Sequence, residues 1–412
     1  SFQRIGLVAM RLQALGKEGL RAGTACEDFG TACGRVFKSF GKWWKELAAR
    51  VDEVLPGPGQ RMGRVRVRDK DEAFGGFRPV TLALLETMAE AGEAFATLGR
   101  RAGVLDELSS GLEDDLAQIG QAGQLLRQLY HDVKFLTSDP DEDWVTWINP
   151  SQSRGLRSLG ATLLEAGSVL RNYWLDGDRA PIMTSATLAV GEDFTHMMNE
   201  LGITRRRPPT VTFTCPSPFD FHRQVRILAP GHFPAPGAPD FSQAVGEVMA
   251  EIGRRIPRKT MGLFTSYRMI TDVEQVMERA GLAIGGAIVK SGTAQVFSQQ
   301  PGSSPGHLLE RFRTAQRALL LGTNTFWEGV DFPGEDLEIL VVTKLPFLVP
   351  NDPWVEARCE RVAAAGENPF TSFMVRDAVL RLRQGFGRLI RRVSDKGVVI
   401  ILDNRLHTKN YG

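Results

Sequence analysis

Two arginines near the end of the sequence have the type and spacing needed to bind a polyphosphate. The run Gln384-Gly-Phe-Gly-Arg-Leu-Ile-Arg391 places Arg388 and Arg391 three residues apart, at the end of a segment with the apolar pattern of a helix. Residues at this spacing share one helix face, and a guanidinium stays charged and binds phosphate oxygens in pairs. The alternative is a basic helix end that interacts with its own terminal carbonyl groups. The run alone leaves both interpretations open.

Two further motifs precede this run and change its interpretation. They are Thr184-Ser-Ala-Thr-Leu188 and Leu321-Gly-Thr-Asn-Thr-Phe-Trp-Glu-Gly-Val-Asp331. Taken in order, the three segments resemble motifs III, V and VI of superfamily 2 helicases. Their residues resemble most closely the iron–sulfur DNA helicases of the XPD/DinG branch, and the resemblance covers roughly residues 143–412.

The resemblance implies an ATP site between two RecA-like domains, in which arginines of the second domain stabilise charge on the transferring phosphoryl group. It assigns this role to Arg388 and Arg391, with Arg391 favoured as the finger. Gln384 would orient Arg388 or the γ-phosphate. Such an arginine is worth on the order of 10³–10⁵ in rate. The other residues that the resemblance places in this cleft are Glu328, Gly329 and Asp331. For Asp331, a turn-capping role is the alternative.

The DNA side of such a protein should use hydroxyl groups and backbone amides, because translocation must not depend on base sequence. The candidates are Thr265, Ser266, Tyr267, Thr323, Thr325, Trp327 and Lys344. Of these, Trp327 could stack on a base or only wedge its own motif, and Lys344 could contact a phosphate. The residues expected to couple the ATP cleft to the DNA are Thr184, Ser185, Ala186 and Thr187, for which an ordinary Ser/Thr turn is the alternative.

The periodicity of the sequence predicts an α/β fold with a helical module. After residue 205, strands and helices alternate, which is typical of a doubly wound, mostly parallel sheet. The resemblance implies that residues 205–412 are the second RecA-like domain and that residues 139–204 are the end of the first. By position, residues 1–138 would be a helical arch. Within 139–204, strands are expected at 144–148 and 158–164, a helix at 165–175, and a buried strand at 181–183.

The first segment is expected to be helical, with interruptions. Gly23, Gly30, Gly34 and Gly41 break the pattern, so the helices of residues 1–55 are predicted to be short or bent. One apolar stripe is expected to consist of Leu7, Met10, Leu12, Leu15 and Leu20. The Trp43–Trp44 pair could stack on bases, or one ring could belong to the core. A strand at 64–68 would present Arg64, Arg66 and Arg68 on one face, either toward a DNA backbone or as a charged edge that avoids self-pairing.

Several parts of a complete helicase are absent from this sequence. No G-x-x-x-x-G-K-S/T loop occurs, and Asp71-Glu-Ala-Phe74 is not a credible DExx box because no buried strand precedes it. The four cysteines are scattered, so no metal site is expected in this chain. We therefore expect the P-loop, the DExH box and the 4Fe–4S cluster of the family to lie upstream of Ser1. ATP and Mg²⁺ would be cofactors of the intact protein.

These observations predict the C-terminal part of a DinG-type helicase that moves 5′-to-3′ on single-stranded DNA in replication or repair. The chain alone should lack ATPase activity. The alternatives are a stand-alone nucleic-acid-binding or regulatory module, or an RNA helicase. The 412 residues contain no apolar run of about 18 residues, so no membrane segment is expected. A monomer in the bacterial cytoplasm is the corresponding expectation.

Overall fold

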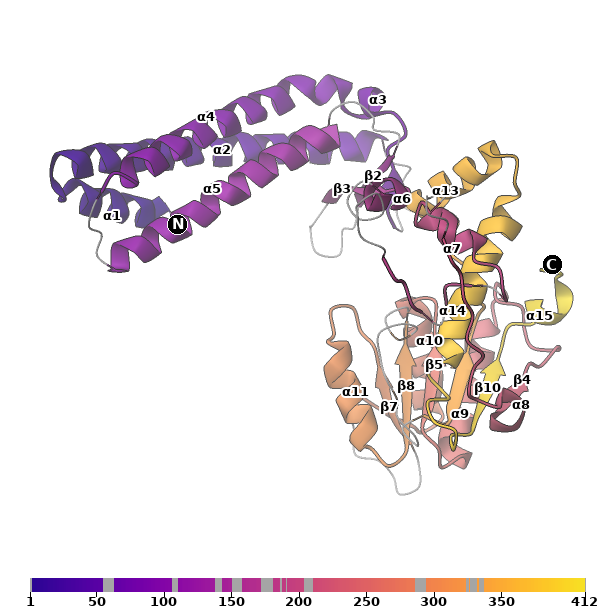
Figure 1. The fold of residues 1–412 in the computed structure, drawn as a ribbon. Coiled ribbons are helices and arrows are strands. Elements are labelled where there is room, and N and C mark those ends of the chain that lie inside the picture. Colours follow the sequence, from indigo (N-terminus) through magenta and orange to yellow (C-terminus); the bar gives the residue numbers. More distant parts are fainter. Residues whose placement is uncertain are drawn as a thin grey trace. The chain divides into compact units, whose positions relative to one another are not determined.

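The chain is described by a computed structural model, and its described residues form two compact units (Figure 1). The first unit comprises Ser1–Leu164 and Pro350–Ala357, and the second comprises Glu165–Val349 and Arg358–Gly412. The division of the sequence at residues 138 and 204 stays a prediction. The structure describes residues 2–54, 63–105, 110–137, 143–149, 158–171, 181–185, 187–189, 191–203, 210–285, 294–323, 326, 332 and 337–411.

The first unit is built mainly from long helices that lie side by side (Figure 1). Its helices are α1 (Phe2–Gln13), α2 (Gly16–Val54), the short α3 (Lys70–Phe74) and η2 (Gly75–Phe77), α4 (Arg78–Ala102) and α5 (Ser110–Thr137). The chain turns back after α1, so α1 packs along the first half of α2. Among the described residues, no helix is long and apolar enough to cross a bilayer.

The expectation of short or bent helices in residues 1–55 is wrong, because α2 is one helix of 39 residues. Two of its glycines instead allow α1 to approach closely. A Cβ atom at Gly23 would lie 2.6 Å from the carbonyl oxygen of Ala9, and one at Gly19 would collide with the carbonyl oxygen of Leu12. The helix tolerates the low intrinsic propensity of glycine because tertiary packing outweighs it.

The apolar stripe predicted for this segment is largely wrong, because the close contact between α1 and α2 buries other residues. Leu12 is buried, but the other four members (Leu7, Met10, Leu15 and Leu20) are 44–60% exposed. The buried face of α1 instead includes Val8 and Ala9, since small residues face the glycines of α2. The interpretation of one tryptophan as core is confirmed: the Trp43 side chain is buried, and its Nε1 donates to the Thr81 hydroxyl at 3.0 Å.

A three-stranded antiparallel sheet completes the first unit and confirms the strands expected at 144–148 and 158–164. Its order is β1 (Val65–Arg66), β2 (Trp144–Asn149), β3 (Ser158–Leu163). The Arg64 guanidinium lies 4.2 Å from the centre of the Trp147 ring, and Arg68 pairs with Glu356. Two of the three arginines next to the edge strand β1 therefore serve contacts within the unit, which favours the charged-edge interpretation.

The second unit contains the predicted doubly wound sheet. Seven parallel strands pair in the order β4-β10-β9-β5-β8-β7-β6. Their bounds are β4 Val225–Leu228, β5 Thr260–Leu263, β6 Ala283–Ile284, β7 Gln295–Ser298, β8 Ala318–Gly322, β9 Ile339–Val342 and β10 Gly397–Ile401. The three central strands β9, β5 and β8 are buried along their whole length, as a parallel sheet with both faces covered requires.

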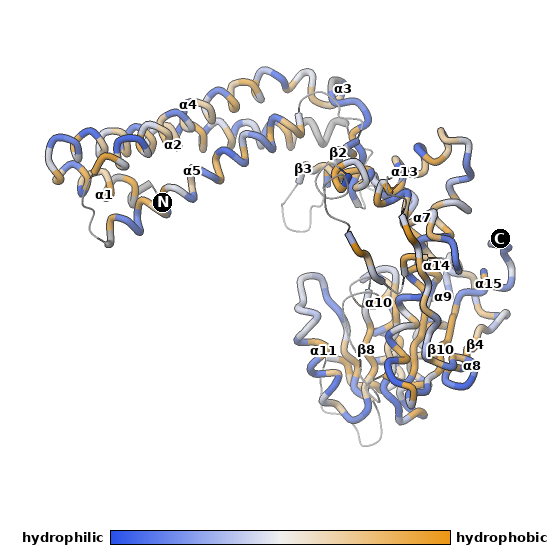
Figure 2. The backbone as a smooth tube through the Cα atoms, in the orientation of Figure 1, coloured by the Kyte–Doolittle hydropathy of each residue, from blue (hydrophilic) through white to orange (hydrophobic). Residues whose placement is uncertain are grey.

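Helices cover both faces of this sheet, and the strands alternate their side chains between two apolar clusters. Leu340 packs with Phe312 and Leu389 on one face, whereas Val341 packs with Phe241 on the other. Figure 2 shows hydrophobic residues concentrated along the strands. The longer helices are α9 (Phe241–Arg255), α10 (Tyr267–Arg279), α11 (Pro305–Thr314), α13 (Pro353–Ala364), the π-helical η5 (Phe370–Val375) and α14 (Arg376–Phe386). The short ones are α6 (Gly167–Leu170), α7 (Thr195–Glu200), α8 (Phe221–Gln224) and α15 (Arg405–Thr408).

The buried strand expected at 181–183 is wrong. The segment is irregular and Ile182 is 87% exposed. A parallel strand is buried only when neighbouring strands cover its edges and helices cover its faces, and no described strand pairs with this segment. The helix expected at 165–175 is limited to α6 within the described residues, and residues 172–175 lie outside them.

Candidate functional site

The carboxyl ends of the central strands bring together loops that are far apart in sequence. Because β9, β5 and β8 are parallel neighbours, the residues that follow them line one edge of the sheet. This is the edge at which open α/β sheets bind ligands. The predicted DNA-contacting residues found along it are Thr265, Ser266 and Tyr267 after β5, Thr323 after β8, and Lys344 after β9.

The loop after β5 leads directly into α10. Ser266 is the N-cap of this helix, and its hydroxyl accepts a hydrogen bond from the Met269 amide at 3.3 Å. Thr265 is exposed, and Tyr267, the first residue of the helix, is 37% exposed. Ser266 therefore fixes the turn, while Thr265 and Tyr267 present a hydroxyl and a ring to solvent.

Thr323, in contrast, is turned into the protein. Its amide and its hydroxyl both donate to Oε1 of Gln299, at 2.8 and 2.9 Å, and Gln299 is only 3% exposed. The hydroxyl hydrogen of Thr323 is thus used within the fold. A contact between Thr323 and DNA stays a prediction; the observed contribution of Thr323 is to fix the start of the loop after β8.

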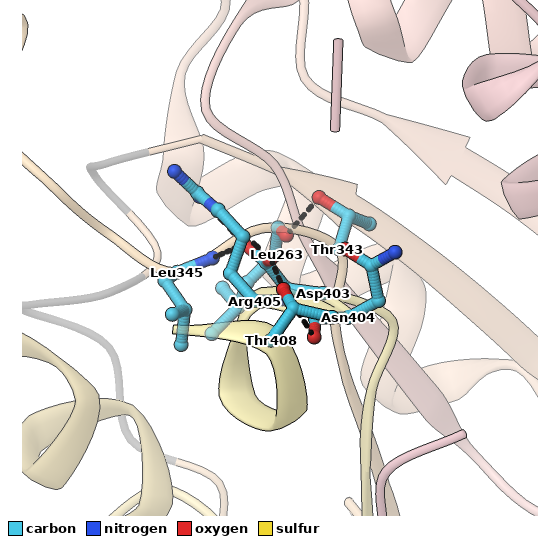
Figure 3. A network of polar contacts seen from close by, with 7 residues as sticks. All are labelled: Leu263, Thr343, Leu345, Asp403, Asn404, Arg405 and Thr408. Atoms are coloured by element: carbon cyan, nitrogen blue, oxygen red, sulfur yellow. Dashed lines mark hydrogen bonds and ion pairs between the residues drawn. The ribbon is translucent and has the colours of Figure 1, made fainter. Parts of the chain in front are cut away.

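A buried carboxylate ties the ends of β9 and β10 together (Figure 3). Asp403 Oδ2 accepts from the Leu345 amide at 2.9 Å, and Oδ1 accepts from the Arg405 amide at 3.0 Å. The Arg405 guanidinium adds contacts of 2.6–3.1 Å. Burial acts to raise the pKa of Asp403, but the hydrogen bonds from Arg405 and Leu345 outweigh it and lower this pKa below its ordinary value. Asp403 is therefore an ionised anchor.

Lys344 lies next to this anchor. Its ammonium nitrogen is 4.9 Å from the centre of the Phe241 ring. The pKa of Lys344 is lowered by burial first and then by the charge of Arg405, with Asp403 acting in the opposite direction. The Lys344 ammonium is thus held in a partly desolvated place, where a phosphate oxygen would stabilise its charge. The neighbouring Thr343 hydroxyl donates to the Leu263 carbonyl at 2.9 Å and ties β9 to β5 (Figure 3).

The predicted phosphate-binding arginines lie at the opposite edge of the sheet. The helix α14 ends at Phe386, and the following residues turn toward the start of β10 at Gly397. The expectation that Arg388 and Arg391 share a helix face is therefore wrong, because the helix ends before both. The physical reason is the burial of Leu389 and Ile390, which are 2% and 3% exposed. Both side chains pack in the apolar cluster on one face of the sheet, and the chain leaves the helix to place them there.

The backbone of this arginine loop, residues 387–396, is fixed although the side chains of Arg391 and Arg392 are exposed. Asp395 Oδ2 accepts from the Arg391 amide at 2.9 Å and from the Arg392 amide at 2.8 Å. Arg391 is exposed, whereas Arg388 and Gln384 are half-buried. The loop can thus present the Arg391 guanidinium to a ligand from a held position.

The segment predicted to couple the two sites reaches α14. Thr184 and Ser185 are exposed, and Ser185 Oγ lies 3.1 Å from the hydroxyl of Thr187. Two residues later, the Ala189 carbonyl accepts from Arg383 Nη1 at 3.1 Å. Since Arg383 directly precedes Gln384 in α14, this segment is connected to the helix that leads to the arginine loop.

A buried arginine secures the surrounding helices. The Arg358 side chain in α13 is 8% exposed, pairs with Glu165 and Glu200, and lies 5.5 Å from the Phe373 ring. Nearby, burial lowers the pKa of His196, aided by Arg376 and Arg358 and opposed by Glu200 and Asp377. Glu165 and Glu200 are therefore attached to α13 by charge, and Asp193 pairs with Arg376 of α14.

Some of the predicted site residues lie outside the described part of the chain. They are Ala186, Thr325, Trp327, Glu328, Gly329 and Asp331. Within the described part, no group of three or more His, Cys, Asp or Glu side chains is placed to hold a metal ion.

Comparisons with known proteins identify the family. A model described as a helicase C-terminal domain matches residues 249–412. The protein named 3′-5′ exonuclease DinG of Bacillus subtilis is 35% identical over 281 residues, covering 68% of this chain and 29% of the relative. The ATP-dependent DNA helicase YoaA of Escherichia coli is 36% identical over 255 residues, covering 62% and 38%. A solved structure titled XPD helicase has the same fold, with a TM-score of 0.54 at 16% identity over 100% of this chain and 62% of that chain. Residues 249–412 of this chain thus match a helicase C-terminal domain, within a longer stretch that is similar to part of the DinG and YoaA proteins.

The resemblance inferred from the three motifs is thus confirmed. The chain spans 29% and 38% of the length of the two curated relatives. Four residues that support the site were not predicted from the sequence: Asp403, Arg405, Gln299 and Asp395. Only Asp403 carried a signal, because it directly follows the apolar run of β10. The others are identified by contacts that only the folded chain makes.

Proposed function

We propose that this chain supplies the arginine side of the ATP site in an ATP-dependent DNA helicase. The observation that carries the proposal is the exposed Arg391 on a loop whose backbone Asp395 holds in place. A preorganised guanidinium stabilises charge that develops on a transferring phosphoryl group and needs no reorganisation at that moment. The name of one relative, the ATP-dependent DNA helicase YoaA, supports the helicase assignment.

The nucleotide fits the donor set of this loop. Arg391 and Arg388 would bind phosphate oxygens of ATP, and Gln384 would orient Arg388. When bound, ATP supplies the phosphoryl group whose transfer to water drives movement. Glu328, Gly329 and Asp331 belong to the same proposal. The sequence contains no G-x-x-x-x-G-K-S/T loop, so the groups that hold magnesium and the other phosphates would not be supplied by this chain.

The carboxyl edge of the sheet is the proposed track for single-stranded DNA. Thr265, Tyr267 and Lys344 offer a hydroxyl, a ring and a cation, which contact backbone and bases without reading sequence. Motion 5′-to-3′ along this track, by a cytoplasmic monomer that acts in replication or repair, completes the proposal. The contact of Arg383 with the Ala189 carbonyl supports the coupling role of residues 184–187.

The test is the DNA-stimulated ATPase of the native polypeptide that contains this chain. Arg391→Ala should lower kcat by about 10³-fold or more, because the developing charge loses its partner. The matched control is Arg392→Ala in the same loop, which should stay within about twofold. Equal activity of Arg391→Ala and the natural protein would refute the assignment.

The isolated chain offers a second test. It should bind single-stranded DNA weakly, with strong salt dependence, and should not hydrolyse ATP. Turnover by the pure chain above contaminant level would contradict the division of the ATP site proposed above. Competition between DNA and RNA strands of the same sequence separates a DNA helicase from an RNA helicase.

A further inference from the structure

A buried glutamine also holds the arginine loop. The Gln224 side chain is 6% exposed, and its Nε2 donates to the carbonyl oxygens of Arg392, Val393 and Asp395, at 3.0, 3.1 and 2.9 Å. These partners are 168–171 residues away in sequence. One side chain therefore binds three peptide groups of the segment that directly follows Arg391.

The sheet itself puts Gln224 in this place. In the parallel pair of β4 and β10, Val225 lies opposite Gly397. The residue before β4 must then lie beside the residues before β10. Gln224 is the last residue of α8, whose N-cap Asp220 accepts from the Arg223 amide at 3.3 Å. The glutamine is thus presented by a capped turn rather than by a free loop.

The chemistry of the contact requires a neutral donor. Three carbonyl oxygens surround Nε2, so the amide cannot be flipped without placing its own oxygen against them. Its two hydrogens serve three acceptors, one of them in a shared bond. The other amide atom, Oε1, is buried and has no hydrogen-bond partner among the residues that the structure describes. A carboxylate of the same shape could not form these bonds at neutral pH.

Gln224 and Asp395 together bind both the amide and the carbonyl groups of the loop backbone. Asp395 accepts hydrogen bonds from the amides of Arg391 and Arg392, whereas Gln224 donates to the carbonyl oxygens that follow. The preceding Leu389 and Ile390 are anchored in the core. The contacts of Gln224 with the loop described above are all with backbone carbonyl oxygens. An effect of Gln224 on the Arg391 guanidinium would therefore pass through the backbone.

We propose that Gln224 is a positioning residue for Arg391, and that ATP hydrolysis depends on it although it contacts no substrate. This inference rests on the proposed function of Arg391. Misplacement of a catalytic group by about 1 Å costs on the order of 10²-fold in rate, so loss of the clamp should reduce kcat far more than it reduces nucleotide binding.

The first experiment measures the loop in the isolated chain by hydrogen exchange. Gln224→Met keeps the length of the side chain and removes its donors. We expect exchange of the peptide covering residues 388–396 to become about tenfold faster or more. The peptide covering β9 should stay protected, which shows that the sheet is intact. The matched control is Gln243→Met on the surface of α9, where Gln243 bonds only Glu247 and Arg279 among the contacts described. Unchanged exchange of residues 388–396 in Gln224→Met would show that Gln224 does not hold this loop.

The second experiment is kinetic and uses the native polypeptide. Gln224→Met should lower kcat for ATP by about ten- to hundredfold, with KM changed by less than about threefold, and should have no further effect in an Arg391→Ala background. Should Gln224→Met reduce kcat as strongly without Arg391, the role is general stability and the inference fails. An Arg391→Ala protein with full activity would refute the proposed function instead, so the two failures are distinguishable.

Discussion

Two buried glutamines hold loops at opposite edges of the same sheet, and they use opposite ends of the amide. At the carboxyl edge, Gln299 accepts two hydrogen bonds from Thr323 with its oxygen. At the amino edge, Gln224 donates to three carbonyls with its nitrogen. The residue type is the same, but the backbone that each one faces has opposite polarity. The comparison teaches that the tolerated substitutions at a buried polar position follow from the partner, and not from the residue type.

The largest effect is expected from the charged anchors of the two edges. Asp403 is fully buried with a paired Arg405, whereas Asp395 is half-buried and accepts backbone amides. Asp403→Ala should cost about 3–5 kcal/mol, because Arg405 and the Leu345 amide lose their partner. Asp395→Ala should cost only about 1 kcal/mol. Urea unfolding of both variants measures the difference, and equal losses would break the comparison.

Exchanging each glutamine for glutamate tests the polarity argument directly. Gln224→Glu places a carboxylate against three carbonyls and should destabilise the fold by about 3 kcal/mol. Gln299→Glu keeps an acceptor for Thr323 and should cost about 1 kcal/mol. Both values come from urea unfolding at pH 7. If Gln299→Glu were the more damaging change, the assignment of donor and acceptor would be reversed.

The pH dependence of the free energy of unfolding tests the contribution of Asp403 at the carboxyl edge. The pKa of Asp403 is lower in the folded chain than the usual value of about 3.9 in unfolded chains. Its stabilisation is therefore fully present above about pH 4 and is lost as the pH falls toward the folded-state pKa. The free energy of unfolding of Asp403→Asn should fall less steeply below pH 4 than that of the natural chain. Parallel curves would show that the ionised carboxylate contributes nothing.

The smallest effect concerns single-stranded DNA binding. Lys344→Met at the carboxyl edge should reduce the slope of log affinity against log salt by about one unit, because one phosphate contact is lost. Lys396→Met, an exposed lysine at the amino edge, is the matched control and should leave the slope unchanged. A reduction by Lys396→Met alone would move the proposed DNA track to the opposite edge.

Much of the fold could be predicted from the sequence because its signals are local. The hydroxyl and cationic residues after β5, β8 and β9 were predicted as ligand contacts with the help of the resemblance to helicase motifs. The parallel strands follow a local rule, because they are short apolar runs separated by helical patterns. The same rule failed at 181–183, because an apolar run becomes a buried strand only beside neighbours. A different prediction failed at α2, where Gly23 was expected to interrupt the helix but instead allows close contact with α1.

The contacts of Gln224 and Asp395 with the arginine loop could not be predicted, because they depend on residues that only the folded chain brings together. Gln224 and the loop that it binds are separated by nearly 170 positions, and nothing near Gln224 distinguishes it from a surface glutamine. Asp395 could be read as an ordinary turn residue. The role of Arg388 and Arg391 as a pair stays a prediction from type and spacing, and their place after the helix depends on Leu389 and Ile390 entering the core.

The strand order also determines when this domain can be completed during synthesis. β4 is the first strand of the seven to leave the ribosome and β10 is the last, yet in the described part of the chain β4 pairs only with β10. Every other strand can find a partner before β10 emerges, whereas β4 and Gln224 must wait for it. A polypeptide that stops before residue 397 would keep a nascent sheet with an open edge, exposed to aggregation and to proteases. The arginine loop would then be in place only in molecules whose synthesis has passed β10.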